Sequence, residues 1–71
     1  MKVFRELKNG RIVTVDLTVT AVWHTAYFDI PVEVIKYLGP SKDGTRFYLV
    51  KNDKGEEVGV PFNELKDIKS Q

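Results

Sequence analysis

Few side chains in this sequence could carry out catalysis. His24 is the only histidine in 71 residues and there is no cysteine, so no His/Cys metal cluster and no thiolate nucleophile can be assembled. A serine nucleophile would have to be Ser41 or Ser70, and both fall in a predicted loop or tail. We therefore predict that the chain is not an enzyme, with no catalytic residue, no metal and no cofactor. His24 is expected to lie on the surface or to cap a turn.

The glycines do not form a phosphate-binding motif. Neither Gly-x-Gly-x-x-Gly nor Gly-x-x-x-x-Gly-Lys occurs in the chain. Gly39 and Gly44 bracket a loop and are explained by turn geometry. Because so short a chain encloses little volume from which water is excluded, no small-molecule substrate is expected.

A group of aromatic residues is the most distinctive feature of the sequence. Trp23, Tyr27 and Phe28 fall within six residues, in a segment, 20–30, without clean periodicity that we interpret as a long connecting loop. Trp and Tyr are favoured at binding hot spots because they present a large rigid area with a polar group. The loop could form an exposed platform for a partner, or it could fold over an open end of the domain and plug it. In a third, mixed case, Phe28 would lie inside and Trp23 or Tyr27 would be partly exposed.

A second candidate surface is basic and aromatic. Basic residues gather near the predicted turns: Lys8, Arg11, Lys42, Arg46, Lys51 and Lys54. Lys42, Arg46, Lys51 and Lys54, with Tyr48 and Tyr37 on a nearby face, could contact phosphates and stack on bases. The alternative is that these are ordinary solvated turn charges, since acidic residues lie among them.

Composition limits the classes of protein to which the chain can belong. It is 42% hydrophobic and 30% charged, with eleven basic and ten acidic residues and a net charge of +1. A dedicated non-specific nucleic-acid binder usually has a clear basic excess, which is absent here. No apolar run approaches the roughly 20 residues of a membrane span, and no signal peptide is evident at residues 1–6. We expect one domain over residues 1–71, located in the cytoplasm, with no membrane association.

The periodicity and turn signals predict an all-β protein. Asn9-Gly10 suits a type I′ hairpin turn between residues 3–7 and 11–19. In the second of these segments the odd-numbered residues Val13, Val15, Leu17 and Val19 share one face, the pattern of a half-buried strand. Further strands are expected at 32–38, 45–51 and 56–60, separated by a loop at 39–44 and a tight turn at 52–55.

The C-terminal segment has a different pattern. Pro61 should end the strand at 56–60, in which Val58 and Val60 are expected to point inward. Phe62, Leu65 and Ile68 recur every third residue, which favours a short 3₁₀ or helical turn. Residues 69–71 are expected to fray. Five short strands at this spacing predict a small closed barrel, because closure removes exposed strand edges.

The second half of the chain resembles an SH3-like barrel. The resemblance covers residues 32–68. The strand at 32–38 would lead into the n-Src loop at 39–44, and the segments 45–51 and 56–60 would form the distal hairpin. The Gly-x-Ile-Pro-x-Asn-Tyr-Val ending of the family is matched by Gly59-Val60-Pro61-Phe62-Asn63-Glu64-Leu65. The resemblance implies a five-stranded barrel with a 3₁₀ turn after the proline. Signalling SH3 domains bind proline-rich ligands in an aromatic groove, but Glu64 stands at the position of the groove tyrosine and Thr45-Arg46 near that of the paired tryptophans.

Two functions remain open at this point. The first is a non-enzymatic module that binds a protein or peptide through Trp23, Tyr27 and Phe28, with Tyr48 nearby. The second is a small nucleic-acid-binding accessory protein that uses Lys42, Arg46, Lys51 and Lys54. As a whole, the chain also resembles small proteins encoded by prophages of Gram-positive bacteria, a resemblance that implies no mechanism. We expect a monomer, although an exposed edge strand could mediate dimerisation by β-addition.

Overall fold

The computed structural model describes residues 1–70 and contains seven strands and one 3₁₀ turn. The strands are β1 (Lys2–Glu6), β2 (Ile12–Asp16), β3 (Val19–His24), β4 (Asp29–Pro40), β5 (Arg46–Lys51), β6 (Glu57–Pro61) and β7 (Leu65–Ser70), with the 3₁₀ turn η1 (Phe62–Glu64) between β6 and β7. The all-β prediction is therefore confirmed, as is a 3₁₀ turn after Pro61. That turn ends at Glu64, and Leu65 and Ile68, which were expected to belong to it, lie in β7. No helix in the described part of the chain is long and apolar enough to cross a membrane.

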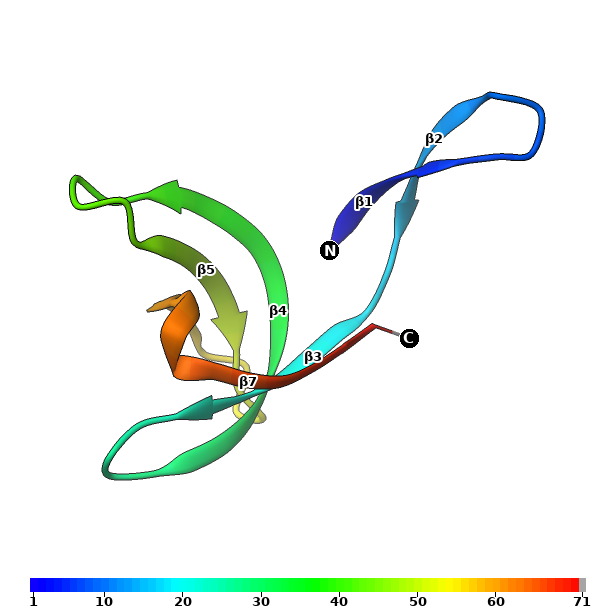
Figure 1. Ribbon diagram of the computed structural model, residues 1–71. Helices are drawn as coiled ribbons and strands as arrows, with labels where there is room; N and C mark the ends of the chain where they lie inside the picture. The colour runs from blue at the N-terminus through cyan, green and yellow to red at the C-terminus, as the bar shows by residue number, and fades with distance from the viewer. Residues whose placement is uncertain (71) are drawn as a thin grey trace.

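The strands form two separate antiparallel sheets. Strands β1 and β2 make a two-stranded ribbon, and the other five form a sheet in the order β6-β5-β4-β3-β7. Figure 1 shows the ribbon projecting away from the curled five-stranded sheet. The molecule is accordingly elongated, with principal extents of 47 × 29 × 19 Å and a radius of gyration of 13.8 Å. A compact domain of this length would have a radius of gyration of about 11 Å.

The long strand β4 gives the five-stranded sheet its curvature. Its first half pairs with β3 and its second half pairs with β5. The register with β5 shifts between Val34 and Lys36 and again between Tyr37 and Gly39. Extra residues of this kind bend a strand and increase its twist, and Figure 1 shows β4 as a strongly curved strand. Within residues 1–70, the terminal strands β6 and β7 do not pair with each other, so the sheet stays open and the predicted closure into a barrel is wrong.

The core is small and lies on the concave side of this sheet. It consists of seven buried apolar residues: Val19, Ala21, Val32, Val34, Val50, Val60 and Leu65. Trp23, Ile30 and Tyr48 are partly buried and pack against it, as do Met1 and Leu17 at the root of the ribbon. No buried polar or charged residue interrupts this core in the described part of the chain.

Several predicted element boundaries are wrong. The segment 11–19 is not one strand, since β2 ends at Asp16 and β3 begins at Val19, although Val13, Val15, Leu17 and Val19 do share the more buried face. The predicted loop 20–30 is mostly strand, because β3 continues to His24 and β4 begins at Asp29. The backbone of β3 is paired on both sides, with β4 and with β7.

The C-terminal segment also differs from the prediction. Lys69 and Ser70 belong to β7, which pairs with β3, and Gln71 lies outside the described residues. Val60 is fully buried, but Val58 remains 37% exposed. Val58 is opposite the buried Val50, so the two share a face. Because β6 is an edge strand, that end of it has no neighbour to cover Val58.

Candidate functional site

A short turn at the end of the β3–β4 hairpin holds the aromatic residues. The amide of Thr25 donates to the carbonyl of Phe28 over 2.9 Å. The Thr25 hydroxyl oxygen in turn accepts hydrogen bonds from the amides of Tyr27 (3.1 Å) and Phe28 (3.2 Å). Hydroxyl-to-backbone bonds of this type fix a tight turn. The side chains of residues 25–28 are therefore presented on a defined hairpin end rather than on a long loop.

Trp23 and Phe28 meet at this hairpin end. Their ring centroids are 5.0 Å apart with an interplanar angle of 86°, the edge-to-face arrangement that aromatic pairs favour. Trp23 is half-buried, Phe28 is 41% exposed and Tyr27 is 92% exposed. The mixed case is nearest to this arrangement, although it is Trp23 that is half-buried against the core, whereas Phe28 and Tyr27 are exposed. We call Trp23, Tyr27 and Phe28 the aromatic surface.

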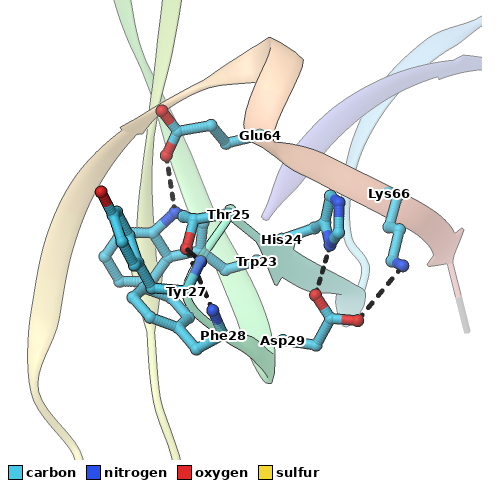
Figure 2. Close-up of polar contacts among 8 residues, drawn as sticks. All are labelled: Trp23, His24, Thr25, Tyr27, Phe28, Asp29, Glu64 and Lys66. Atoms are coloured by element: carbon cyan, nitrogen blue, oxygen red, sulfur yellow. Dashed lines mark hydrogen bonds and ion pairs between the residues drawn. The ribbon is translucent and has the colours of Figure 1, made fainter.

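A distant carboxylate anchors Trp23. Its indole Nε1–H donates to Glu64 Oε1 over 2.9 Å, and Figure 2 shows Glu64 reaching from η1 to the indole ring. Trp23 is also opposite Leu65 in the pairing of β3 with β7. The polar group of the indole is thereby satisfied while its ring supports Phe28. Glu64 is part of this site through that bond.

Tyr48 belongs to a different aromatic group. Its ring lies 5.1 Å from Tyr37 and 5.8 Å from Phe62, both in tilted arrangements. Tyr37 and Phe62 are 44% and 47% exposed, whereas Tyr48 packs against the core. The turn η1 lies between the two groups, since Phe62 contacts Tyr48 and Glu64 contacts Trp23. The structure thus does not bring Tyr48 into the aromatic surface.

A polar cluster lies beside the aromatic surface. Asp29 accepts a hydrogen bond from His24 Nδ1 and pairs with Lys66 Nζ at 3.3 Å, as Figure 2 shows. The hydrogen bond with His24, followed by that with Lys66, lowers the pKa of Asp29 below its ordinary value. All three side chains are about half exposed. The cluster ties the first residue of β4 to β3 through His24 and to β7 through Lys66, and His24 acts there as a hydrogen-bond partner on the surface.

The four predicted phosphate-contacting residues are divided between the two ends of β5. Lys42 and Arg46 lie at its start, whereas Lys51 and Lys54 lie at or beyond its end. Five residue steps along a strand amount to about 17 Å. Because side chains alternate along a strand, Lys51 also points to the face opposite Arg46 and Tyr48. The four residues therefore do not form one patch.

Acidic groups accompany both pairs of cations. In the β4–β5 turn, the hydroxyl of Ser41 and the amide of Thr45 donate to Asp43. These bonds lower the pKa of Asp43 to about 2, with the Ser41 bond as the largest cause. At the other end, Lys51 is opposite Glu33 and Glu57 in the sheet. Residues 1–70 contain no group of three or more side chains placed to bind a metal ion.

Sequence reasoning missed two features of the surface. The Glu64–Trp23 bond joins residues 41 positions apart, and no local pattern predicts such a contact. Phe4 and Ile12 on the ribbon are 82% and 71% exposed, and the sequence reasoning did not identify them as an exposed apolar pair. Comparisons with protein family models, curated proteins and solved structures found no match for this chain.

Proposed function

We propose that this chain is a non-enzymatic interaction module that binds a peptide or protein segment on the aromatic surface. The observation that carries the proposal is the exposure of Tyr27 (92%) and Phe28 (41%) at a hydrogen-bonded hairpin end. Exposed aromatic side chains on a rigid support lose little conformational entropy when a partner binds. Trp23 and its bond to Glu64 provide that support.

The proposal includes an SH3-like arrangement of the five-stranded sheet. Three features support it: the 3₁₀ turn between the last two strands, the bent strand β4 shared by both halves of the sheet, and the β5–β6 hairpin with its turn at 52–55. The partner would then contact the side of the sheet on which η1 lies. Because Glu64 occupies the position of the groove tyrosine and bonds to Trp23, we expect a partner other than a proline-rich segment.

Peptide selection followed by binding measurements tests the proposal. A displayed library of random 12-residue peptides would be selected on the wild-type protein, and the affinity of the selected peptides measured by Trp23 fluorescence. We expect Tyr27→Ala to weaken binding about 10-fold or more, since exposed aromatic anchors contribute about 1–2 kcal/mol. Tyr37→Ala is the matched control, because Tyr37 is another exposed aromatic residue and lies outside the aromatic surface. Peptides that bind the Tyr27→Ala protein as tightly as wild type would refute the proposed site.

A nucleic-acid accessory function is the alternative proposal. The exposed Tyr37 next to Tyr48 offers a ring on which a base could stack. Against it, the four cations are divided between two ends of β5. Amide NMR spectra recorded with a mixed-sequence DNA at low and at physiological salt distinguish the two functions. Shifts confined to residues 42–54 that fade as salt rises would favour nucleic acid.

A further inference from the structure

The β1–β2 ribbon is an apolar element that its own chain leaves uncovered. Its strands contact mainly each other, and it joins the five-stranded sheet only at its root. There the amide of Leu17 donates to the Met1 carbonyl and the Met1 nitrogen donates to the Leu17 carbonyl, both over 2.7 Å. Phe4 (82% exposed) and Ile12 (71% exposed) stand on one face of the ribbon. An isolated two-stranded ribbon is only marginally stable in water, so a covering surface is needed.

The five-stranded sheet has an unfilled apolar cleft on its open side. Seven apolar residues line this cleft: Met1, Val19, Val34, Tyr48, Phe62, Leu65 and Ile68. Its volume is about 130 Å³. An apolar protein cavity of about 150 Å³ accommodates a benzene molecule. The cleft is thus of the size and polarity to accept one phenyl ring.

Phe4 cannot reach the cleft of its own chain. Met1 lines the cleft, and β1 runs from there into the ribbon, which Figure 1 shows pointing away from the sheet. Three residues of strand place Phe4 about 10 Å beyond Met1. A return of the ring would require both bonds between Met1 and Leu17, and the β1–β2 pairing, to break.

We propose that two copies of this chain form a symmetric dimer in which each ribbon inserts Phe4 into the apolar cleft of the other copy. The contact is reciprocal, as a two-fold axis requires, so both copies fill their cleft and cover their ribbon. This arrangement replaces the expectation of a monomer. It does not depend on the proposed peptide site, since the aromatic surface lies on the other hairpin.

The distribution of charge agrees with a second copy as the occupant. Residues 1–17 carry four basic side chains and two acidic ones, leaving seven of the eleven basic and eight of the ten acidic residues for the rest of the chain. The ribbon is therefore net positive and the remainder net negative. Each ribbon would approach a body of opposite sign, and such complementarity speeds association and suppresses wrong pairings.

The size of the contact indicates a weak dimer. An aromatic side chain buries about 150–250 Å², and the cleft loses a comparable area, so two Phe4 contacts account for roughly 600–1,000 Å². A specific interface needs about 1,000 Å² or more, so Ile12 and the ribbon backbone must supply the remainder. We expect a dissociation constant on the order of 10–100 μM, typical of small interfaces.

Sedimentation equilibrium from about 1 μM to about 1 mM protein tests the dimer over that range of affinity. We expect wild type to pass from monomer to dimer, and Phe4→Ala to remain monomeric throughout. Tyr27→Ala is the matched control, because it removes a comparably exposed aromatic ring from the other hairpin and should dimerise as wild type does. Circular dichroism of all three proteins checks that the fold is kept.

A complementation experiment identifies the surface that receives Phe4. Ile68 lines the cleft and is 45% exposed, so Ile68→Glu should close the cleft to a phenyl ring without unfolding the sheet. Alone, Ile68→Glu and Phe4→Ala should each be monomeric. When the two variants are mixed, Phe4 of the Ile68→Glu protein can still enter the intact cleft of the Phe4→Ala protein, so one of the two contacts is restored. Unlabelled Ile68→Glu should therefore shift the amide resonances of the cleft residues Val19, Val34 and Leu65 in labelled Phe4→Ala.

Three results would overturn the proposal. The first is a wild-type protein that stays monomeric at about 1 mM. The second is a Phe4→Ala protein that dimerises as wild type does, or a mixture that leaves the cleft resonances unchanged while wild type dimerises. The third is the finding that the amide resonances of the ribbon do not change with protein concentration but shift when a mixed-sequence duplex DNA is added. That result would indicate that the ribbon binds nucleic acid instead.

Discussion

Two valines on the same edge strand provide a direct test of how this small protein is stabilised. Val60 is fully buried, whereas Val58, two residues earlier on β6, is 37% exposed. Both pair with β5, opposite Tyr48 and Val50 respectively. Replacement of either residue by alanine removes the same two methyl groups and the same β-branch from the same strand. The difference between Val60→Ala and Val58→Ala therefore isolates the contribution of burial.

The structure gives the size of the expected difference. Removing two buried methyl groups costs about 1.6 kcal/mol of transfer free energy. The void that remains adds about 1 kcal/mol where neighbours cannot collapse into it, so Val60→Ala should destabilise the protein by about 2–3 kcal/mol. At Val58 no void forms, and a loss of about 0.5–1 kcal/mol is expected from reduced strand preference and partial exposure.

This difference is large for a chain of 71 residues. At about 0.05–0.15 kcal/mol per residue, the free energy of unfolding should be about 4–10 kcal/mol. Val60→Ala should lower the melting temperature by about 10–20 °C. Urea unfolding followed by both Trp23 fluorescence and far-ultraviolet circular dichroism gives the free energies, and an unchanged m-value would show that both variants unfold from a similar native state. Equal losses for the two variants would contradict the difference in burial between Val60 and Val58.

Two further predictions concern hydrogen bonds near the surface. Glu64→Ala should destabilise the protein by about 1 kcal/mol and shift the fluorescence emission of Trp23 to longer wavelength. Glu64→Gln keeps a hydrogen-bond acceptor and serves as the milder control. Unchanged emission in Glu64→Ala would contradict the bond. Because the pKa of Asp43 is lowered to about 2, below its unfolded value of about 3.9, its contribution to stability is present above about pH 4 and is lost as the pH falls toward 2. A carboxyl NMR titration should find this pKa and show it raised in Ser41→Ala, and an ordinary pKa in wild type would contradict the turn geometry.

The turns were predictable from the sequence because their chemistry is local. Gly10 and Gly55 have positive φ values of 80° and 82°, which glycine adopts without steric cost, so Asn9-Gly10 and the turn at 52–55 are where the sequence indicates. The predicted type I′ geometry at Asn9-Gly10 is wrong, because that turn needs positive φ at both residues and Asn9 does not have it. Pro61 ends β6 for an equally local reason, since it has no amide to donate. These positions depend on the residues themselves and not on the rest of the fold.

The wrong predictions concern elements that form only through long-range pairing. Every residue of β7 after Leu65 is exposed, so no alternation of apolar and polar residues marks it, and it is a strand because it pairs with β3. The break between β2 and β3 has no turn signal of its own, because it separates strands that belong to different sheets. The aromatic surface was predicted as a group of residues, but its support by Glu64 depends on a contact across 41 positions.

The small core and the exposed ribbon together imply that stability should depend on protein concentration. Association that involves only the folded state stabilises it, by about 1–1.6 kcal/mol per chain at about 1 mM protein for a dissociation constant on the order of 10–100 μM. For a domain of this size, each kcal/mol raises the melting temperature by about 4–8 °C. Between about 1 μM and about 1 mM, the melting temperature of wild type should therefore rise by roughly 5–10 °C. Tyr27→Ala should show the same rise, whereas Phe4→Ala should melt at one temperature throughout. A wild-type melting temperature that does not change with concentration would mean that the ribbon stays uncovered and that the 130 Å³ cleft receives no ring from a second copy.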